Sequence, residues 1–582
     1  MTATVSPSAA TGTVTFYQGT TSLGAGTLSA GTATLTISLT TPGTYSLMAV
    51  YDGSTTYAAS TSSAISVTVS SSTNLTTTST TLASSTYSTT TGANFTLTAT
   101  VSPTAATGTV TFYSGTTSLG TGTLNAGTAT LATYFSAAGT YSLTAVYSGD
   151  TAYASSTSSA ISVAAISAAS SNSWSAGTCG YGTAAYLLSS GSIAETGDSY
   201  SASNSDESVI CLLGGTAILT DPTITSSGAT SSTDNSSFYG LDAAVLAYNG
   251  GTLTISGGTI STTGQGGNDV FAYGSGVVNV SNTAITATGN NGHGLYAAGA
   301  GVMTVNSVTA TTTGASGSVV ATDRGGGIIT ITGGNYSASG DKSAGIYSTG
   351  TVKATNATFS AVLGEAVVIE GSNVVALNNV TLTTPSTGEH RGIFLYQSMS
   401  GDATANSDCG TTGACFTMTN GTFNYTDTTN SSSTATANCS AFTVANQVAL
   451  FTLTDVTINN SCPTLLLSAL NTQWNYNGGA ATFKAYGTTL IGSVIVDSVS
   501  TAAITLSQDS AGTASSLTGA INTANTGKTA SLTLDSTSAW IVTGTSYLTT
   551  LTDADSAYSN IKCQTAGCKV YIGSLYITPA AK

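Results

Sequence analysis

The stretch that decides the fold is TLTISGGTISTTGQGGNDVFAY at residues 252–273, followed by VVNVSNTAITATGNNGHGLYA at residues 277–297. Each copy holds three short runs of β-branched and aromatic residues, separated by turns of Gly, Asn and Ser. An apolar residue of the first run recurs at spacings of 25, 25 and 26 residues, at Ile255, Val280, Val305 and Ile331. Three brief strands in a repeated unit of this length predict a parallel β-helix, in which each coil buries its apolar face against its neighbours.

The repeat extends well beyond these two copies. Ala354 and Leu377 continue the same position, and LIGSVIV at 490–496 is echoed by LTGAINT at 517–523, so the coils extend to at least Trp540. We predict a parallel β-helix over residues 249–560 with a C-terminal cap over 561–582. Because an open coil end exposes unpaired edge groups, we assign the irregular stretch 166–248 to an N-terminal cap and the first coils.

Composition supports an ordered all-β chain. Only 6% of the 582 residues are charged, yet the chain contains 27 Tyr and 13 Phe together with many Val, Ile and Thr in alternating runs. Disordered chains are poor in such residues. Alternation with a period of two is typical of strands, and apolar residues at helical spacing are scarce.

The charge distribution excludes whole classes of partner. Nine Lys and Arg stand against 24 Asp and Glu, and the first basic residue in the chain is Arg324. Nucleic-acid binding needs clustered cations, so we expect no nucleic-acid partner and no anionic bilayer surface as a ligand. Membrane insertion is not expected either, because no apolar run reaches the roughly 18–20 residues that span a bilayer.

Eight cysteines fall in four local pairs, which predict disulfides and therefore an oxidising, extracellular compartment. The predicted pairs are Cys179 with Cys211, Cys409 with Cys415, Cys439 with Cys462, and Cys563 with Cys568. Buried free thiols are the alternative reading. None of the pairs has the spacing of a zinc site, and we expect no cofactor, with Ca²⁺ left open.

The first 165 residues are a duplication without gaps. Pro7 and Pro103, Phe16 and Phe112, and Tyr45 and Tyr141 each differ by 96 positions. Alternating runs such as TVTFY and YSLMAVY, bounded by Gly, Pro and Ser, predict two antiparallel β-sandwiches, over 1–70 and 71–165. By the same offset Met1 corresponds to Leu97. The first copy is therefore expected to lack one or two strands, through truncation or through completion by a strand of another subunit.

The phrases GTVTFYxG, GTLxAGTAT and AVYxGxxxYAxSTS of these copies resemble group 3 bacterial Ig-like domains. That resemblance implies a spacer or stalk without catalysis. In the second part, HGLYA, AGIYS and the segment SLTLDSTSAWIVTGTSYLTTL at 531–551 resemble secreted right-handed β-helix surface proteins, namely autotransporter passengers and pectate-lyase-like folds. The chain departs from the autotransporter pattern, because no amphipathic barrel segment follows, and it contains no LPxTG-type sorting motif.

Chemistry-bearing side chains gather ahead of the third run of several coils. Asp269, His293 and Glu365 hold this place, as do His390 and Arg391, and Ser318 and Ser343 are assigned to the same column. Equivalent positions on adjacent coils stack about 4.8 Å apart. If the chain is an enzyme, these residues are its candidate catalytic groups, as acid and base of a glycosidase or as the proton-abstracting residues of a lyase. The alternative, which we favour, is that they are polar turn residues of a solvent-exposed rod.

The sequence therefore predicts Ig-like β-sandwich repeats followed by a right-handed parallel β-helix, in an extracellular, adhesin-like structural protein without catalysis. Its expected partner is a glycan or another cell-surface ligand, bound along an uncharged face. A polysaccharide-active enzyme and a self-associating filament subunit are the alternatives. Thr-x-Thr runs such as TATTTG at 309–314 do not recur at matching positions in the raw spacing, which disfavours a flat ice-binding face.

Overall fold

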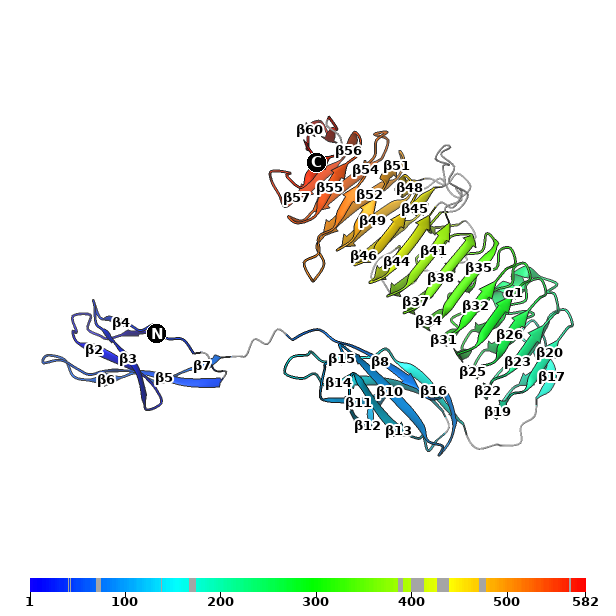
Figure 1. The fold of residues 1–582 in the computed structure, drawn as a ribbon, viewed down its shortest axis with the longest axis horizontal. Helices are drawn as coiled ribbons and strands as arrows, with labels where there is room; N and C mark the ends of the chain where they lie inside the picture. The colour runs from blue at the N-terminus through cyan, green and yellow to red at the C-terminus, as the bar shows by residue number, and fades with distance from the viewer. Residues whose placement is uncertain are drawn as a thin grey trace.

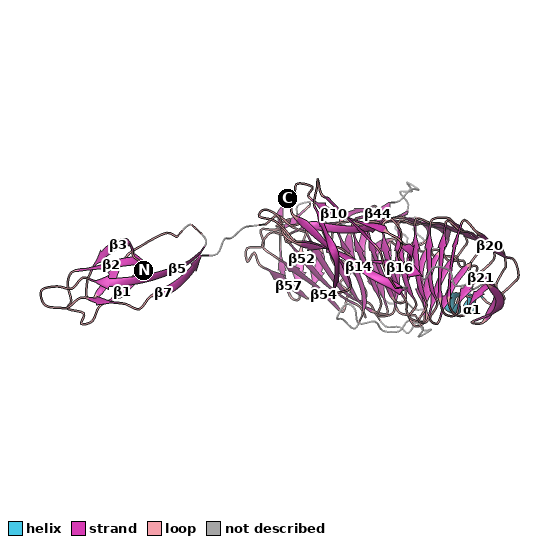
Figure 2. Ribbon diagram, turned by 90° about the horizontal axis from the view of Figure 1, so that it is seen from below, coloured by secondary structure: helices cyan, strands magenta, loops and turns pink. Residues whose placement is uncertain are grey.

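The computed structural model describes residues 1–39, 41, 43–69, 75–137, 139–166, 174–385, 391–398, 413–426, 439–469, 478–564 and 567–582. Strands make up most of this part of the chain, and α1 (Thr233–Tyr239) is its single helix (Figure 2). Two small antiparallel β units come first along the chain, and a long stack of parallel strands follows them (Figure 1). The predicted fold class, Ig-like sandwiches followed by a parallel β-helix, is confirmed.

The two N-terminal units share a strand pattern but differ at one edge. In the second unit, β10 (Phe95–Ser102) pairs with both β13 (Thr128–Thr133) and β8 (Ser79–Ser84). In the first unit, β1 (Thr2–Thr4) pairs with β4 (Thr32–Thr34) in a sheet of two described strands.

The missing edge changes the burial of the first unit's core. Ile65 is 58% exposed, whereas Ile161, its counterpart 96 positions later, is 4% exposed. A cavity of about 400 Å³ opens beside Phe16 and Leu47 of the first unit. The first core is thus covered less completely than the second, as the shorter first copy led us to expect.

Three sheets form the walls of the β-helix, and each coil adds one strand to each sheet. We call them sheets A, B and C after the order of their strands within a coil. Sheet A includes β25 (Thr252–Ser256), β28 (Val277–Ser281), β31 (Val302–Asn306), β34 (Ile328–Thr332), β37 (Thr351–Thr355) and β40 (Val374–Asn378). Sheet B includes β20 (Ser199–Ala202), β23 (Thr223–Ser226), β26 (Thr259–Thr262), β29 (Ala284–Ala287), β32 (Thr309–Thr312), β35 (Asn335–Asp341), β38 (Thr358–Leu363), β41 (Thr381–Pro385), β44 (Thr422–Thr426) and β47 (Thr457–Asn460). Sheet C includes β24 (Val245–Tyr248), β27 (Val270–Tyr273), β30 (Leu295–Ala298), β33 (Val320–Asp323), β36 (Ile346–Ser348), β39 (Val367–Glu370) and β42 (Ile393–Tyr396).

The repeating apolar position sets the register of sheet A. Ile255 pairs with Val280, Val280 with Val305, and Val305 with Ile331, and the column continues through Ala354 to Leu377, as the spacing predicts. All six side chains are at most 3% exposed. Stacking of equivalent apolar residues on successive coils therefore builds one continuous core along the rod.

The turn between sheets A and B has a fixed backbone conformation. Asn282, Asn356 and Asn379 have φ values of 52°, 56° and 52°, in the left-handed region that Asn tolerates better than most residues. The backbone N–H of Asn356 donates to Asn378 O at 3.1 Å on the next coil, and that of Asn379 donates to Thr419 O at 2.8 Å. The Asn379 side-chain amide also donates to Asn356 Oδ1 at 2.7 Å. This asparagine ladder fastens one coil to the next at the corner.

The first coils begin earlier than the sequence suggested. β18 (Gly182–Leu188) already pairs in parallel with β21 (Glu207–Leu212), and β17 (Ser175–Cys179) covers β18 as an antiparallel strand. α1 is inserted before β24. Ser232 caps its N-terminus by accepting from Asn235 N at 3.2 Å, and Gly240 ends it with φ 75°.

Three of the four predicted disulfides are confirmed. They join Cys179 to Cys211, Cys439 to Cys462, and Cys563 to Cys568, with Cα–Cα distances of 6.4, 5.6 and 5.7 Å. The fourth predicted pair includes Cys409, which lies outside the described residues, so this pair stays a prediction. Within the described segments, no helix is long and apolar enough to cross a membrane.

Candidate functional site

The strand pairs of sheet C decide which of the predicted site residues share a column. Val270, Leu295, Val320, Ile346, Val367 and Ile393 are successive partners. The residues two positions earlier are therefore Asn268, His293, Ser318, Ala344, Glu365 and Arg391. Assigning Asp269 and Ser343 to the column of His293 was wrong by one residue, because the turns before the strands differ in length. His390 lies outside the described residues.

Asp269 lies inside the rod rather than on its surface. Its side chain is 0% exposed, and neither carboxylate oxygen has a hydrogen-bond partner among the described residues. Burial raises the pKa of Asp269 well above its ordinary value, because a charge without a partner is costly in an apolar interior. A protonated, enclosed carboxyl cannot reach a polysaccharide outside the coil.

His293 is also a buried group with local partners. Its backbone N–H donates to Asn268 Oδ1 at 3.1 Å, its Nδ1 lies 3.3 Å from Ser318 O, and its ring packs 4.6 Å from that of Tyr296. Burial lowers the pKa of His293 to about 4, so the imidazole is neutral at pH 7. These contacts fasten three coils together and account for the residue structurally.

Glu365 and Arg391 are brought together by the fold. Their side chains approach to 4.0 Å, and the Arg391 guanidinium lies 4.4 Å from the centre of the Phe394 ring. Burial lowers the pKa of Arg391, while the Glu365 carboxylate opposes this shift. Asp269, however, lies four coil steps from Glu365, or about 19 Å. Paired carboxylates of glycosidases are roughly 5–9.5 Å apart, so the fold does not bring these two together as an acid–base pair.

Sequence reasoning missed a cluster of four tyrosines at the N-terminal end of sheet C. Tyr248 and Tyr273 are strand partners whose rings stack at 4.8 Å. Tyr239, at the end of α1, packs edge-on against Tyr273 at 5.6 Å, and Tyr181 stacks on Tyr239 at 4.0 Å. Tyr181 is 60% exposed, so the cluster opens to solvent. The endings VLAY and VFAY of β24 and β27 were a signal for half of it.

A second aromatic group surrounds Glu370 on the same sheet. Glu370 is 5% exposed and accepts hydrogen bonds from the hydroxyls of Tyr347, Tyr396 and Ser398. The Tyr396 ring stacks on Phe394 at 4.7 Å. Burial, aided by the neighbouring Tyr396 and Glu370, raises the pKa of Tyr347, so this tyrosine stays a hydrogen-bond donor at neutral pH.

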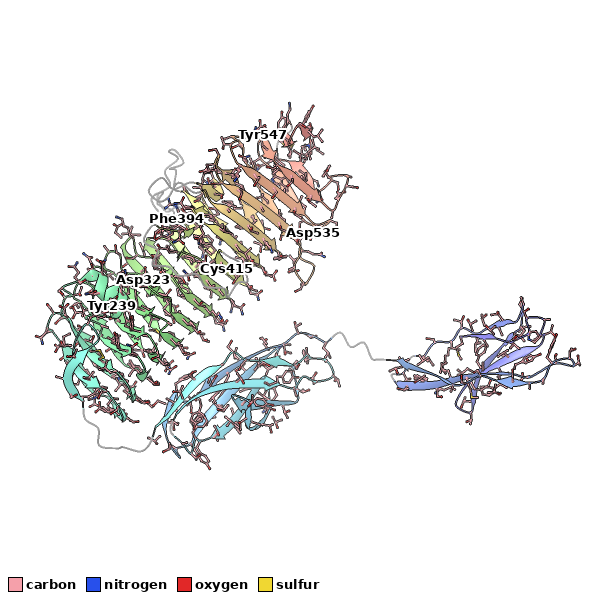
Figure 3. All side chains as sticks on the ribbon, turned by 180° about the vertical axis from the view of Figure 1, so that it is seen from behind. Tyr239, Asp323, Phe394, Cys415, Asp535 and Tyr547 are labelled. Atoms are coloured by element: carbon pink, nitrogen blue, oxygen red, sulfur yellow. A yellow bond between two sulfur atoms is a disulfide. The ribbon has the colours of Figure 1, made fainter. Side chains whose placement is uncertain are left out.

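Two ion-bearing contacts lie between the tyrosine cluster and the Glu370 group. Asp323, at the end of β33, accepts from the Tyr296 hydroxyl at 3.1 Å, and the Arg324 guanidinium lies 3.7 Å from the centre of the Phe238 ring. Tyr239, Asp323 and Phe394 follow one another along the rod (Figure 3). Aromatic rings, carboxylates and arginines thus line the outer side of sheet C over many coils, and we call this surface the aromatic face. It consists of Tyr181, Phe238, Tyr239, Tyr248, Tyr273, Asp323, Arg324, Tyr347, Glu370, Phe394 and Tyr396.

The described residues hold no grouping of three or more His, Cys, Asp or Glu arranged for a metal ion. The aromatic face is therefore a surface for stacking and hydrogen bonding in the part of the chain that the structure describes.

Comparison with known proteins identifies only the N-terminal part. The model of the bacterial Ig-like domain (group 3) matches residues 1–70 and 80–165. Together with the disulfides, this match is consistent with an extracellular protein. No curated protein matches the chain.

Two solved structures show remote similarity. The fibronectin(III)-like modules of Clostridium thermocellum CbhA are 19% identical, with 27% of this chain and 78% of that chain covered and a TM-score of 0.15. The family 28 exopolygalacturonase of Yersinia enterocolitica is 10% identical, with 82% of this chain and 95% of that chain covered and a TM-score of 0.24. Neither similarity is close enough to assign a function, and the matched family covers residues 1–70 and 80–165 only.

Proposed function

We propose that this protein is an extracellular, adhesin-like rod that binds a neutral polysaccharide along its aromatic face, with the Ig-like units as a spacer. The observation that carries the proposal is the tyrosine cluster, in which stacked rings are partly open to solvent. Tyrosine offers an apolar ring and a polar hydroxyl at little entropic cost. Sugar rings present apolar C–H faces and hydroxyl edges, which match these two features.

Charge favours a neutral ligand over an acidic one. The chain has a formal net charge of −15, and Asp323 and Glu370 belong to the aromatic face itself. A polyuronate would be repelled by this field at long range. A neutral glycan avoids that penalty and still gains the stacking contacts.

Binding at each site is expected to be weak. An open face buries less of a ligand than a closed pocket does, so single contacts contribute little. A long polymer, however, can engage the tyrosine cluster and the Glu370 group together, and many copies of the protein on one surface add avidity. This mode of binding suits adhesion better than catalysis.

The test is binding of the full chain to neutral and acidic polysaccharides by affinity electrophoresis and calorimetry. We expect the Tyr239→Ala/Tyr273→Ala variant to lose about 1–3 kcal/mol, a roughly 5- to 150-fold rise in Kd. The Tyr239→Phe/Tyr273→Phe variant keeps both rings and is expected to retain most of the affinity. Tyr134→Ala removes a tyrosine that is 56% exposed outside the rod and is the matched control.

Retention on no neutral polysaccharide, or equal binding by the alanine and wild-type proteins, would overturn the proposal. The same incubations can be assayed for new reducing ends. Cleavage that is lost in Glu365→Gln would instead favour the enzyme alternative.

A further inference from the structure

The outer surface of sheet B is a regular array of small polar side chains. Two outward positions of each strand, two residues apart, align with their counterparts on the next coil from β20 to β47 without a register shift between them. All twenty side chains are exposed or half-buried. We call this surface the hydroxyl face. Its first column is Ser199, Thr223, Thr259, Ala284, Thr309, Asn335, Thr358, Thr381, Thr422 and Thr457. Its second column is Ser201, Thr225, Ser261, Thr286, Thr311, Ser337, Ser360, Thr383, Asn424 and Asn459.

This array corrects the expectation drawn from raw sequence spacing. The Thr-x-Thr runs do recur at matching positions, because coils of different length place their extra residues in turns and leave the strand register intact. Thr259, Thr309 and Thr358, for example, occupy one column although their separations along the chain differ.

The composition of the hydroxyl face is uniform. Threonine holds 11 of the 20 positions, and Asp, Glu, Lys, Arg and aromatic residues hold none. The outward positions of sheet A, by contrast, include Lys353 and Lys484. The face is thus set apart from the neighbouring sheet and from the aromatic face of sheet C.

Its spacing is fixed by β geometry. Equivalent side chains on adjacent coils are about 4.8 Å apart, and the two columns are about 6.7 Å apart along each strand. Side chains also tie the array together, since Ser360 Oγ donates to Ser337 Oγ at 3.1 Å and the Asn459 amide donates to Asn424 Oδ1 at 2.7 Å. The result is a rigid, two-dimensional lattice of hydroxyl and methyl groups.

One end of the face has room and need for ordered water. A hollow of about 420 Å³ lies among Ser201, Thr225 and Ser261 and is lined entirely by Ser, Thr and Ala. Ser226, which lines it, is 3% exposed, and its Oγ has no hydrogen-bond partner in the described part of the chain. A buried hydroxyl beside a polar space is satisfied by a held water.

We propose that the hydroxyl face binds ice, through water molecules held on its lattice. A single hydroxyl gains little by exchanging water for a soluble sugar, because the net value of such a hydrogen bond is small. A periodic array gains only against a partner that is itself periodic and matches many groups at once. Ordered water meets this condition without desolvation of the hydroxyls, and its oxygen repeats are comparable with the spacings of this face.

The proposal is independent of glycan binding, because it concerns a different sheet. The experiment measures thermal hysteresis and inhibition of ice recrystallisation with the full chain. We expect the wild type to be active in both assays. The Thr286→Lys/Thr311→Lys variant places two charges in the centre of the array and is expected to abolish both activities.

Controls separate loss of the face from loss of the fold. Thr304→Lys puts one charge on the outward side of β31 in sheet A, on the same coil as Thr309 and Thr311, and is expected to remain active. The Tyr239→Ala/Tyr273→Ala variant is expected to retain full ice activity, so failure of the glycan proposal would not affect this one. Far-UV circular dichroism checks that each variant is folded. A wild type without effect on ice growth would overturn the proposal, as would a folded double-lysine variant with unchanged activity.

Discussion

Truncation of Phe442 tests whether stacked aromatic side chains hold the middle of the rod together. Phe442 is 1% exposed, and its ring packs edge-on against Phe423 at 5.8 Å, Phe451 at 5.3 Å and Phe483 at 5.0 Å. Phe442→Ala removes a whole buried ring and leaves a cavity, which ordinarily costs about 3–5 kcal/mol. Because three aromatic contacts are lost at once, we expect a cost near about 4–5 kcal/mol.

The assay is urea unfolding of the full chain followed by far-UV circular dichroism. Each coil is stabilised by its neighbours, so we expect the transition of the rod to move to lower urea, and coils next to the cavity to unfold first. Ile491→Ala is the control, since Ile491 is 51% exposed and its loss should change the free energy of unfolding by less than about 0.5 kcal/mol. A Phe442→Ala protein within about 1 kcal/mol of the wild type would refute the reasoning, because such a site would not be a close-packed core.

Three further predictions follow from the ladder, the buried acid and a disulfide. Asn356→Ala should lower the free energy of unfolding by about 1–2 kcal/mol, since alanine is strained at φ 56° and the hydrogen bond from Asn379 is lost, whereas Asn356→Gly should cost less; urea midpoints of the two variants give the comparison. Burial raises the folded-state pKa of Asp269, so its folded form holds the proton more tightly and the stability of the protein should be greatest below about pH 4 and fall as pH rises toward the raised pKa. Asp269→Asn should remove this fall, and thermal unfolding of both proteins between pH 3 and pH 8 would reveal parallel curves if the idea is wrong. Replacing Cys439 and Cys462 by Ala opens a disulfide with a sequence separation of 23 and should cost about 3 kcal/mol, while an unchanged melting temperature without reductant would contradict this.

The periodic part of the fold could be predicted from sequence because its physical cause is local and repeated. Ile255, Val280, Val305 and Ile331 must all point inward, so the same place in each coil is apolar, and the spacing reveals the coil length. The duplication of the first 165 residues and the pairing of nearby cysteines were equally legible, since each depends on comparing residues that are close or regularly spaced.

The site was less predictable, because coils vary in length and the sequence does not reveal which turn takes up the difference. That uncertainty of one residue decides whether a side chain points into the rod or out of it. It moved Asp269 into the interior, out of the column of His293, and it hid the alignment of Thr259, Thr309 and Thr358.

The sequence by itself therefore determined an all-β chain of Ig-like units and stacked parallel coils, because burial of repeated apolar residues leaves no other economical arrangement. Only the tertiary structure decided the surfaces. Tyr181 and Tyr239 reach Tyr273 through a covering strand's turn and an inserted helix, contacts that no local pattern encodes. The hydroxyl face likewise exists only once interstrand hydrogen bonds fix the register of successive coils, since an array is a property of many strands and not of any one of them.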